Sequence, residues 1–369
     1  MQLLGAPQRL VALASERRRI AHRPSVDIVA DAIVPRSQRQ DIETYDPNDR
    51  QPFAGWKAGV YNKDRRVCEA SLLERHWTRV TVPFSVREID LEDIRRRRGE
   101  AMYGGLLFHH FGRFLLETTN RLWWCLAEQF RGPIIFQNTK PRLGMPDFAR
   151  RYFALLGLAD RVVIAEQSLG FDRVVIPHRS YIGQRSFHDE FHVPFLAAGA
   201  AAERLPLAES DTFGAGMTGL YLSRTRFANR SSLGEPLVEK YFADSGFYIA
   251  HTQELPLEKQ ILLVRRHRKI AGIAGSAFHN ILFSEGRLQP VYICKDYDIN
   301  INYFMIDELM QNDGTYIYSG SAVEAETPKS ARELLDGHWD DVALDTAKVL
   351  RCLDDSIDRP AQGDVGRSG

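Results

Sequence analysis

The feature that most limits the fold of this chain is a regular alternation of short apolar runs and amphipathic segments between residues 219 and 294. The runs have strand length and are rich in aliphatic and aromatic residues, whereas the segments between them repeat their apolar residues at helical spacing. Strands are expected at 219–224, 247–251, 269–275 and 290–294, and helices at 235–246, 256–267 and 276–284. Strict alternation of this kind predicts a doubly wound parallel sheet with helices on its faces.

A second, less regular α/β pattern precedes it. Its strands are expected at 79–84, 133–137, 161–165 and 173–177, and its helices at 111–130 and 146–157. Residues 1 to about 75 predict only a short helix at 9–19. A turn-rich stretch at 187–218 interrupts the alternation of strands and helices and favours a domain boundary. We therefore expect an N-terminal α/β domain at 1–210, a Rossmann-like domain at 211–325 facing it across a cleft, and closing helices with a flexible tail at 326–369.

The amino-acid composition limits the cellular compartment and the binding partners that we expect for this chain. Lys plus Arg equals Asp plus Glu at 48 each, so no overall field favours nucleic acid. The 4 cysteines form no CxxC pair, which argues against a zinc site or a disulfide framework. No apolar run approaches membrane-spanning length, so a cytoplasmic protein is expected. The basic run Arg95–Arg98 is typical of an exposed helix or loop, and it leaves open a peripheral association with the inner face of the membrane.

Ligands of parallel sheets bind beyond the carboxyl ends of the strands, so the residues after each expected strand are the first candidates. Ser223, Arg224, Arg226 and Arg230 end and follow the strand at 219–224. Guanidinium groups suit the fork-like contacts that a diphosphate requires. The alternative is that these arginines are solvated and pair with Glu235 or Glu239.

The stretch KIAGIAGSAFHN at 269–280 is the second candidate, because a strand there ends in glycines and leads into a helix. Gly272 and Gly275 would permit close backbone approach, and Ser276 is expected to cap the helix and add its hydroxyl group to an anion site. Together with the arginines it predicts a two-part diphosphate site. His279 could contact phosphate or sugar, or only pack, and Asn280 could serve either the ligand or the loop.

Two polar residues follow the strand at 247–251. Glu254 could accept the hydroxyl groups of a ribose or sugar, or it could cap the next helix. Gln260 lies one turn into that helix.

The stretch FHHFGRFLLETTNRLWW predicts a third site. Arg113, Glu117 and Arg121 are spaced i, i+4, i+8 and would share one helix face lining the cleft. Glu117 is a candidate general base and His110 the competing one, because flanking arginines would lower the carboxyl pKa. The alternative is an exposed, ion-paired stripe.

These blocks, in this order, resemble glycosyltransferase family 61, which includes bacterial capsular-polysaccharide biosynthesis proteins and eukaryotic xylosyl- and N-acetylglucosaminyltransferases. The blocks are FGRFLLETTNRLWW, YLSRTRFANRSSLGE, GFYIAHTQELPLEKQILLVRRHRKIAG and GIAGSAFHNILFS. The resemblance covers residues 104–294. It implies a GT-B fold of two Rossmann-like domains and inverting transfer from a nucleotide-sugar, with neither a metal nor another cofactor.

The resemblance also implies site roles. Arg224 and Arg230 would bind the phosphates beside Gly275 and Ser276, with Gln260 and Asn280 in support. The acceptor would be a glycan or lipid-linked glycan of a capsular, exopolysaccharide or lipopolysaccharide pathway.

Two departures from the family pattern affect the function. Arg113 stands where many members carry a histidine, and Ala274 stands where the eukaryotic members carry one. A non-catalytic nucleotide- or glycan-binding protein is therefore the alternative, and transfer of another group such as pyruvyl is a third reading.

Overall fold

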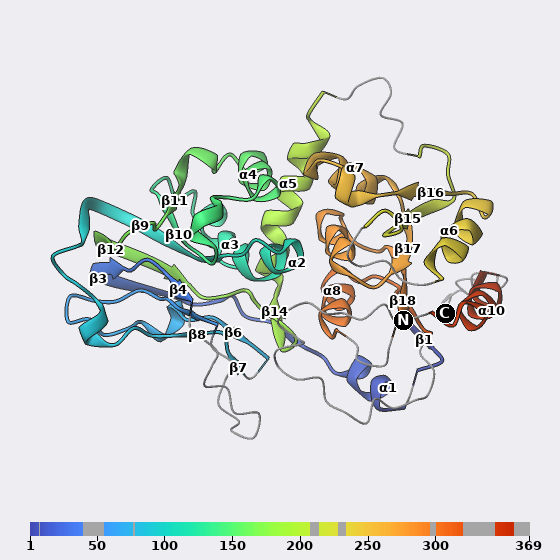
Figure 1. Cartoon of the computed structure of the whole chain (residues 1–369), viewed down its shortest axis with the longest axis horizontal. Helices are drawn as coiled ribbons and strands as arrows, with labels where there is room; N and C mark the ends of the chain where they lie inside the picture. Colours follow the sequence, from blue (N-terminus) through green and yellow to red (C-terminus); the bar gives the residue numbers. More distant parts are fainter. Residues whose placement is uncertain are drawn as a thin grey trace, which may run out of the picture.

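The structure is a computed structural model that describes residues 1–6, 8–39, 55–76, 78–206, 214–227, 234–295, 300–319 and 344–357. Two sheets organise these residues and lie beside each other, joined by helices (Figure 1). Arg230, the expected helix near 330 and the expected flexible tail fall outside the described residues, so they stay predictions.

The C-terminal sheet has six parallel strands in the order β1-β19-β18-β17-β15-β16. Its strands are β1 (Gln2–Leu4), β15 (Gly219–Leu222), β16 (Phe247–Ala250), β17 (Lys269–Ile273), β18 (Gln289–Cys294) and β19 (Thr315–Tyr318). Its helices are α6 (Glu235–Asp244), α7 (Leu257–Arg266), η8 (Ser276–Phe283), α8 (Asn302–Met310) and α10 (Thr346–Ile357). The four strands expected between 219 and 294 are confirmed, and so are the helices expected at 235–246 and 256–267. The third expected helix, at 276–284, is the 3₁₀ helix η8.

The N-terminal sheet has the order β11-β10-β9-β12-β3. Its strands are β3 (Val26–Val34), β9 (Arg95–Leu107), β10 (Ile134–Asn138), β11 (Val162–Ile164) and β12 (Leu169–Pro177). Four of them are parallel, and β3 is antiparallel to β12 at the edge. The mixed α/β class with parallel sheets is therefore confirmed, with one antiparallel strand that the sequence pattern did not indicate.

Several short elements complete the N-terminal half. The helices are α1 (Gln8–Ser15), α2 (Phe111–Arg113), α3 (Leu122–Ala127), α4 (Asp147–Leu155) and α5 (Val193–Glu203). The short strands are β2 (Arg19–Ile20), β4 (Gln38–Arg39), β5 (Trp56–Lys57), β6 (Glu74–Arg75), β7 (Thr78–Arg79), β8 (Thr81–Val82), β13 (Tyr181–Ile182) and β14 (Ser186–His188). The single strand expected at 79–84 is wrong, because β7 and β8 belong to different small sheets.

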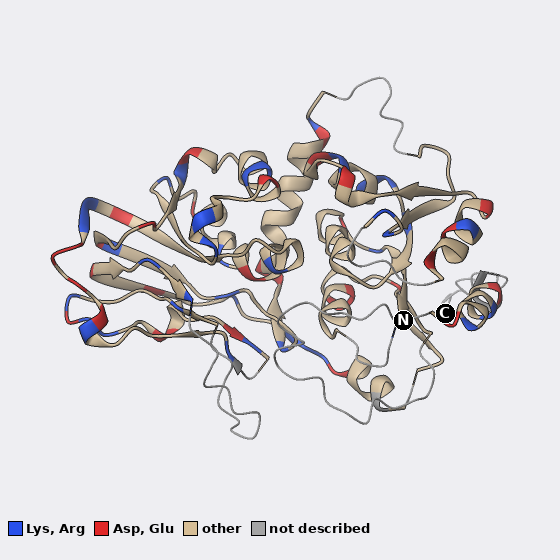
Figure 2. Cartoon of the chain, viewed as in Figure 1, with Lys and Arg blue, Asp and Glu red and all other residues tan. Residues whose placement is uncertain are grey.

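The Arg95–Arg98 run is not a helix or loop but the start of β9, and Figure 2 shows it at the end of the molecule far from the C-terminal sheet. The strand was missed because its buried part, AMYGGLL, holds two glycines and no β-branched residue. Gly104 is required there, since a Cβ atom at this position would lie 2.4 Å from the Phe136 ring of β10.

One continuous apolar core runs through both halves. It joins Phe136 and Phe153 of the first half to Leu220 and Phe283 of the second, with Phe195 of α5 between them. Gly199 of α5 lies so close to η8 that a Cβ atom would be 2.5 Å from the Phe283 carbonyl oxygen. The division into two domains facing a cleft, with boundaries near 210 and 325, stays a prediction. Residues 2–4 nevertheless add a strand to the C-terminal sheet.

Within the part of the chain that the structure describes, no helix combines the length and the apolar character that crossing a bilayer requires.

The buried carboxyl group of Asp307 links α8 to the C-terminal sheet through hydrogen bonds. It predicts a pH dependence of the free energy of unfolding. Asp307 accepts hydrogen bonds from the hydroxyl groups of Tyr292 (2.9 Å) and Tyr316 (2.6 Å) and from Asn312 (3.0 Å). Burial raises the pKa of Asp307 to about 6, although these donors act in the opposite direction. A raised pKa stabilises the fold at low pH, and this contribution disappears as the pH rises through 6.

We expect the unfolding free energy of the wild type, relative to Asp307→Asn, to fall by up to about 3 kcal/mol between pH 4 and pH 7. Urea unfolding at a series of pH values measures it. Parallel pH profiles for the two proteins would contradict the assignment.

Candidate functional site

The carboxyl ends of two strands from different sheets lead into segments that touch. β9 is followed by His109 and α2, and β17 is followed by Ala274, Gly275 and η8. Gly112 of α2 packs directly on η8, because a Cβ atom there would lie 2.8 Å from His279 Nδ1 and 3.0 Å from Ser276 Cβ. The structure therefore brings together the blocks FHHFGRF and GSAFHN, whose contact no local sequence pattern indicates.

His279 is enclosed at this contact. It is 5% exposed, and neither ring nitrogen has a hydrogen-bond partner among the described residues. Burial, with a smaller effect from the charge of His110, lowers the pKa of His279 to about 3. The imidazole is therefore neutral at physiological pH and packs near Tyr303, with ring centroids 5.7 Å apart.

His110 has the opposite environment. It is exposed and stands at the N-cap of α2, where its Nδ1 accepts a hydrogen bond from the Arg113 backbone N–H at 3.4 Å. Its neighbour His109 is half-buried, with Nε2 2.7 Å from Asn138 Oδ1 at the end of β10. Of the predicted bases, His110 is the more accessible.

Arg224 follows β15 and lies beside the glycine turn. A Cβ atom at Gly275 would be 3.4 Å from Arg224 Nη1, so the two predicted diphosphate-binding elements are neighbours. Glu235, which the alternative interpretation pairs with the arginines, accepts a hydrogen bond from the Arg224 backbone N–H at 2.8 Å. Ser223 donates its hydroxyl to Glu239, so this serine supports the loop.

One expectation for the glycine turn is wrong. Ser276 is the first residue of η8 and Gly275 is its N-cap, without a side-chain capping bond, so no serine cap exists. Gly275 has an extended backbone with φ of −174°, which any residue can adopt, and its role beside a ligand stays a prediction. Gly272 makes a close approach within the sheet, where φ is +155° and a Cβ atom would lie 2.8 Å from the Leu222 carbonyl oxygen of β15. Glycine at 272 thus serves sheet packing.

The amide side chains of Gln260 and Asn280 bond to each other. Asn280 donates to Gln260 Oε1 at 3.0 Å and Gln260 donates to the Leu255 carbonyl at 2.9 Å, which fixes α7 against η8. Glu254 instead lies near the surface and pairs with Arg226 at 3.1 Å. The first pair suits the supporting role that the resemblance implies, whereas the sugar-binding role of Glu254 stays a prediction.

Glu117 lies at the centre of a buried ion-pair cluster. It belongs to a π-helical turn, Phe114–Thr118, and its side chain is 6% exposed. Oε1 accepts from Arg75 Nε at 2.7 Å, and Oε2 accepts from Arg113 Nη2 at 2.9 Å. Burial alone would raise the pKa of Glu117, but the charges of Arg113 and Arg75 outweigh it and hold the pKa below its ordinary value. Both oxygens are thus engaged, which does not favour a proton-accepting role.

Arg121 does not share the face of Arg113 and Glu117, so the i, i+4, i+8 prediction is wrong for it. The segment 111–130 is no continuous α-helix: the π-helical turn follows α2 and α3 begins only at Leu122. A π turn changes the angular step between residues, which rotates Arg121 away. It is 2% exposed and donates to the carbonyls of Ala70 and Pro177.

No sequence pattern indicates Arg75, the second partner of Glu117. This residue lies in the two-residue strand β6, far from Glu117 in the chain. Only the folding of residues 55–90 against the N-terminal sheet brings it to the cluster.

Gly112 gives a direct test of the contact between α2 and η8. We expect Gly112→Ala to reduce the free energy of unfolding by about 1–3 kcal/mol, because the new methyl group overlaps His279. Gly183→Ala is the matched control, since its Cβ would meet Arg75 Cγ at an ordinary 3.4 Å. Equal urea midpoints for the two variants would contradict the close packing.

No group of three or more His, Cys, Asp or Glu residues placed to hold a metal ion occurs in the described ranges.

Comparison with known proteins gives one family. The Glycosyltransferase 61 family model matches residues 111–290, which begins at α2 and ends within β18. It spans both segments that meet at Gly112. No curated protein matches the chain.

Proposed function

The chain carries a glycosyltransferase 61 segment at residues 111–290, and from this premise we propose that it is an inverting, metal-independent glycosyltransferase. Its donor is a nucleotide-sugar and its acceptor a glycan or lipid-linked glycan. Capsular, exopolysaccharide or lipopolysaccharide synthesis on the cytoplasmic side of the membrane is the proposed setting.

The observation that carries this proposal is the meeting of Arg224, Gly275 and η8 with the start of α2. Arg224 and the Gly275 turn lie at the carboxyl edge of a parallel sheet, where phosphate groups bind. The exposed His110 at the N-cap of α2 follows β9 of the other sheet and stands two residues before Gly112, which packs on η8. Donor and acceptor elements are thus contributed by the two halves.

In the proposed reaction, a base takes the proton of an acceptor hydroxyl group. The oxygen of that hydroxyl group bonds to the anomeric carbon of the donor sugar. The bond from that carbon to the diphosphate breaks, and Arg224, with Arg230, stabilises the negative charge of the leaving group. His110 suits the base better than Glu117, because it is exposed while both carboxylate oxygens of Glu117 hold arginines.

A thermal-shift screen against a panel of nucleotide-sugars tests the proposal. A ligand that binds the folded state raises the melting temperature by mass action. Release of the nucleoside diphosphate from the same donor then separates an enzyme from a binding protein. Binding without release under any acceptor would support the non-catalytic alternative, and stabilisation by a donor that lacks a nucleotide would support transfer of another group.

A further inference from the structure

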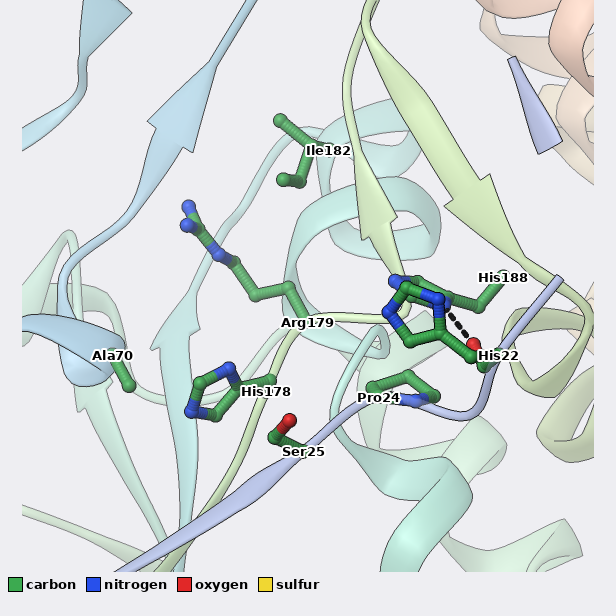
Figure 3. Close-up of a pocket in the computed structure, with 8 residues that line it drawn as sticks. All are labelled: His22, Pro24, Ser25, Ala70, His178, Arg179, Ile182 and His188. Atoms are coloured by element: carbon green, nitrogen blue, oxygen red, sulfur yellow. Dashed lines mark hydrogen bonds between the residues drawn. The ribbon is translucent and has the colours of Figure 1, made fainter. Parts of the chain in front are cut away.

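A cavity outside the site described above lies in the N-terminal half (Figure 3). It has a volume of about 170 Å³ and contains none of the predicted site residues. It lies beyond the carboxyl end of β12, between the segment that leads into β3 and strand β14. Its polar side chains include no carboxylate: they are the hydroxyl group of Ser25, the guanidinium of Arg179 and the imidazoles of His22, His178 and His188.

A hydrogen bond and a ring contact orient two of these imidazoles. His188 Nδ1 lies 2.6 Å from the His22 carbonyl oxygen, which the dashed line in Figure 3 marks. This short contact assigns the proton to Nδ1, because a carbonyl can only accept. The rings of His22 and His188 meet edge to face with centroids 5.4 Å apart. These contacts orient the His22 and His188 rings at the cavity wall.

The nearby carboxylates are shared among several donors. Glu74 Oε2 lies 3.3 Å from Arg179 Nη2 and 3.4 Å from Arg185 Nη1, so one carboxylate serves two guanidiniums. Asp27 lies 3.3 Å from His178 Nε2 and also accepts from the Cys68 thiol. Neither acid lines the cavity.

Arg121 adds a buried positive charge behind the cavity wall. Its Nη2 donates at 2.6 Å to the carbonyl of Ala70, a lining residue, and its Nη1 donates to the carbonyl of Pro177, next to His178. Among the described residues Arg121 makes no ion pair, although it is only 2% exposed. A buried guanidinium that forms no ion pair is unfavourable, and an anion in the adjacent cavity would reduce this cost.

We propose that this cavity binds an anionic group, a carboxylate or a phosphate, carried by the acceptor. The anionic class follows from the guanidinium of Arg179, from a lining without carboxylates and from Arg121. The assignment to the acceptor rests on the proposed function, because the cavity lies in the N-terminal half and Glu254, Gly275 and the other donor-side residues do not line it. The acceptor class would then be an acidic saccharide, a uronic acid or a phosphorylated glycan.

The test uses the full chain labelled with ¹⁵N-histidine and follows the imidazole resonances at constant ionic strength. The probes are glucuronate, inorganic phosphate and, as the uncharged match, glucose. We expect glucuronate or phosphate to shift the signals of His22, His178 and His188, and glucose to leave them in place. Glucuronate alone identifies a saccharide carboxylate, and phosphate alone identifies a phosphoryl group.

Variants confirm the location. His22→Gln with His178→Gln changes two accessible side chains and should weaken binding of the responding anion about tenfold by calorimetry. Arg179→Gln should weaken it as well, and Arg173→Gln, an exposed arginine of β12, is the matched control. Equal shifts with glucose, no shift with either anion, or full affinity in the double variant would overturn the proposal. Donor binding in the thermal-shift screen would show that the proposed function stands independently.

Discussion

Arg224→Ala is expected to reduce sugar transfer about a hundred- to a thousandfold, the loss seen when one donor to a developing negative charge is removed. Arg224 lies beside Gly275 at the carboxyl end of β15, where the departing diphosphate would accumulate charge. Since this interaction strengthens as the bond to the sugar breaks, we expect kcat to fall more than KM rises. Steady-state kinetics with the donor found by thermal shift measures both.

Arg268→Ala is the control for this experiment. Arg268 is exposed and precedes β17 at the amino end of the same sheet. The substitution therefore removes one charge at the edge of the sheet opposite the Gly275 turn. A loss of transfer in both variants would indicate a general effect of charge. Full activity of Arg224→Ala would exclude Arg224 from the reaction.

Glu117→Ala is expected to destabilise the protein by about 3 kcal/mol, because it leaves the positive charges of Arg75 and Arg113 next to each other without a partner. The figure is at the low end for a buried ion pair, since the two arginine side chains are 36% and 26% exposed. Chemical unfolding measures the loss.

The conservative variant Glu117→Gln separates the two roles of this residue. If Glu117 anchors the arginines, the variant loses stability above pH 4.5 and approaches the wild type as the pH falls. The sign follows from the lowered pKa, whose stabilisation is present above the ordinary value of 4.5 and disappears below it. If Glu117 is instead the base, transfer is lost at unchanged stability and donor affinity. An unchanged rate would leave the base role to His110.

The sequence predicts the C-terminal sheet well because its strands and helices depend on local patterns. Runs such as GLYL and PVYI are apolar throughout, as in strands buried on both faces, and each is separated from the next by a helix with one apolar stripe. Glycine at 246 ends α6 with a positive φ, which is also a local signal.

The features that sequence reasoning missed depend on distant partners. β9 starts with four arginines and contains Gly104, where a side chain would overlap the Phe136 ring of β10. Its sequence alone therefore does not indicate a strand. The π-helical turn that displaces Arg121 has no local signature either. Arg75 joins Glu117 through tertiary folding alone. The candidate site therefore keeps its predicted Arg224 and Gly275 but gains a partner of Glu117 and loses Arg121.

The pairing of β1 with β19 has a consequence for how this chain folds. Gln2 pairs with Thr315, so nearly the whole chain lies between two strands that are neighbours in one sheet. Contacts this far apart in sequence slow folding, because a large loop must close before they form. Until then β19 presents an unpaired edge that can recruit another chain. Deleting residues 2–4 is therefore a direct way to learn whether β1 protects the nascent protein from aggregation.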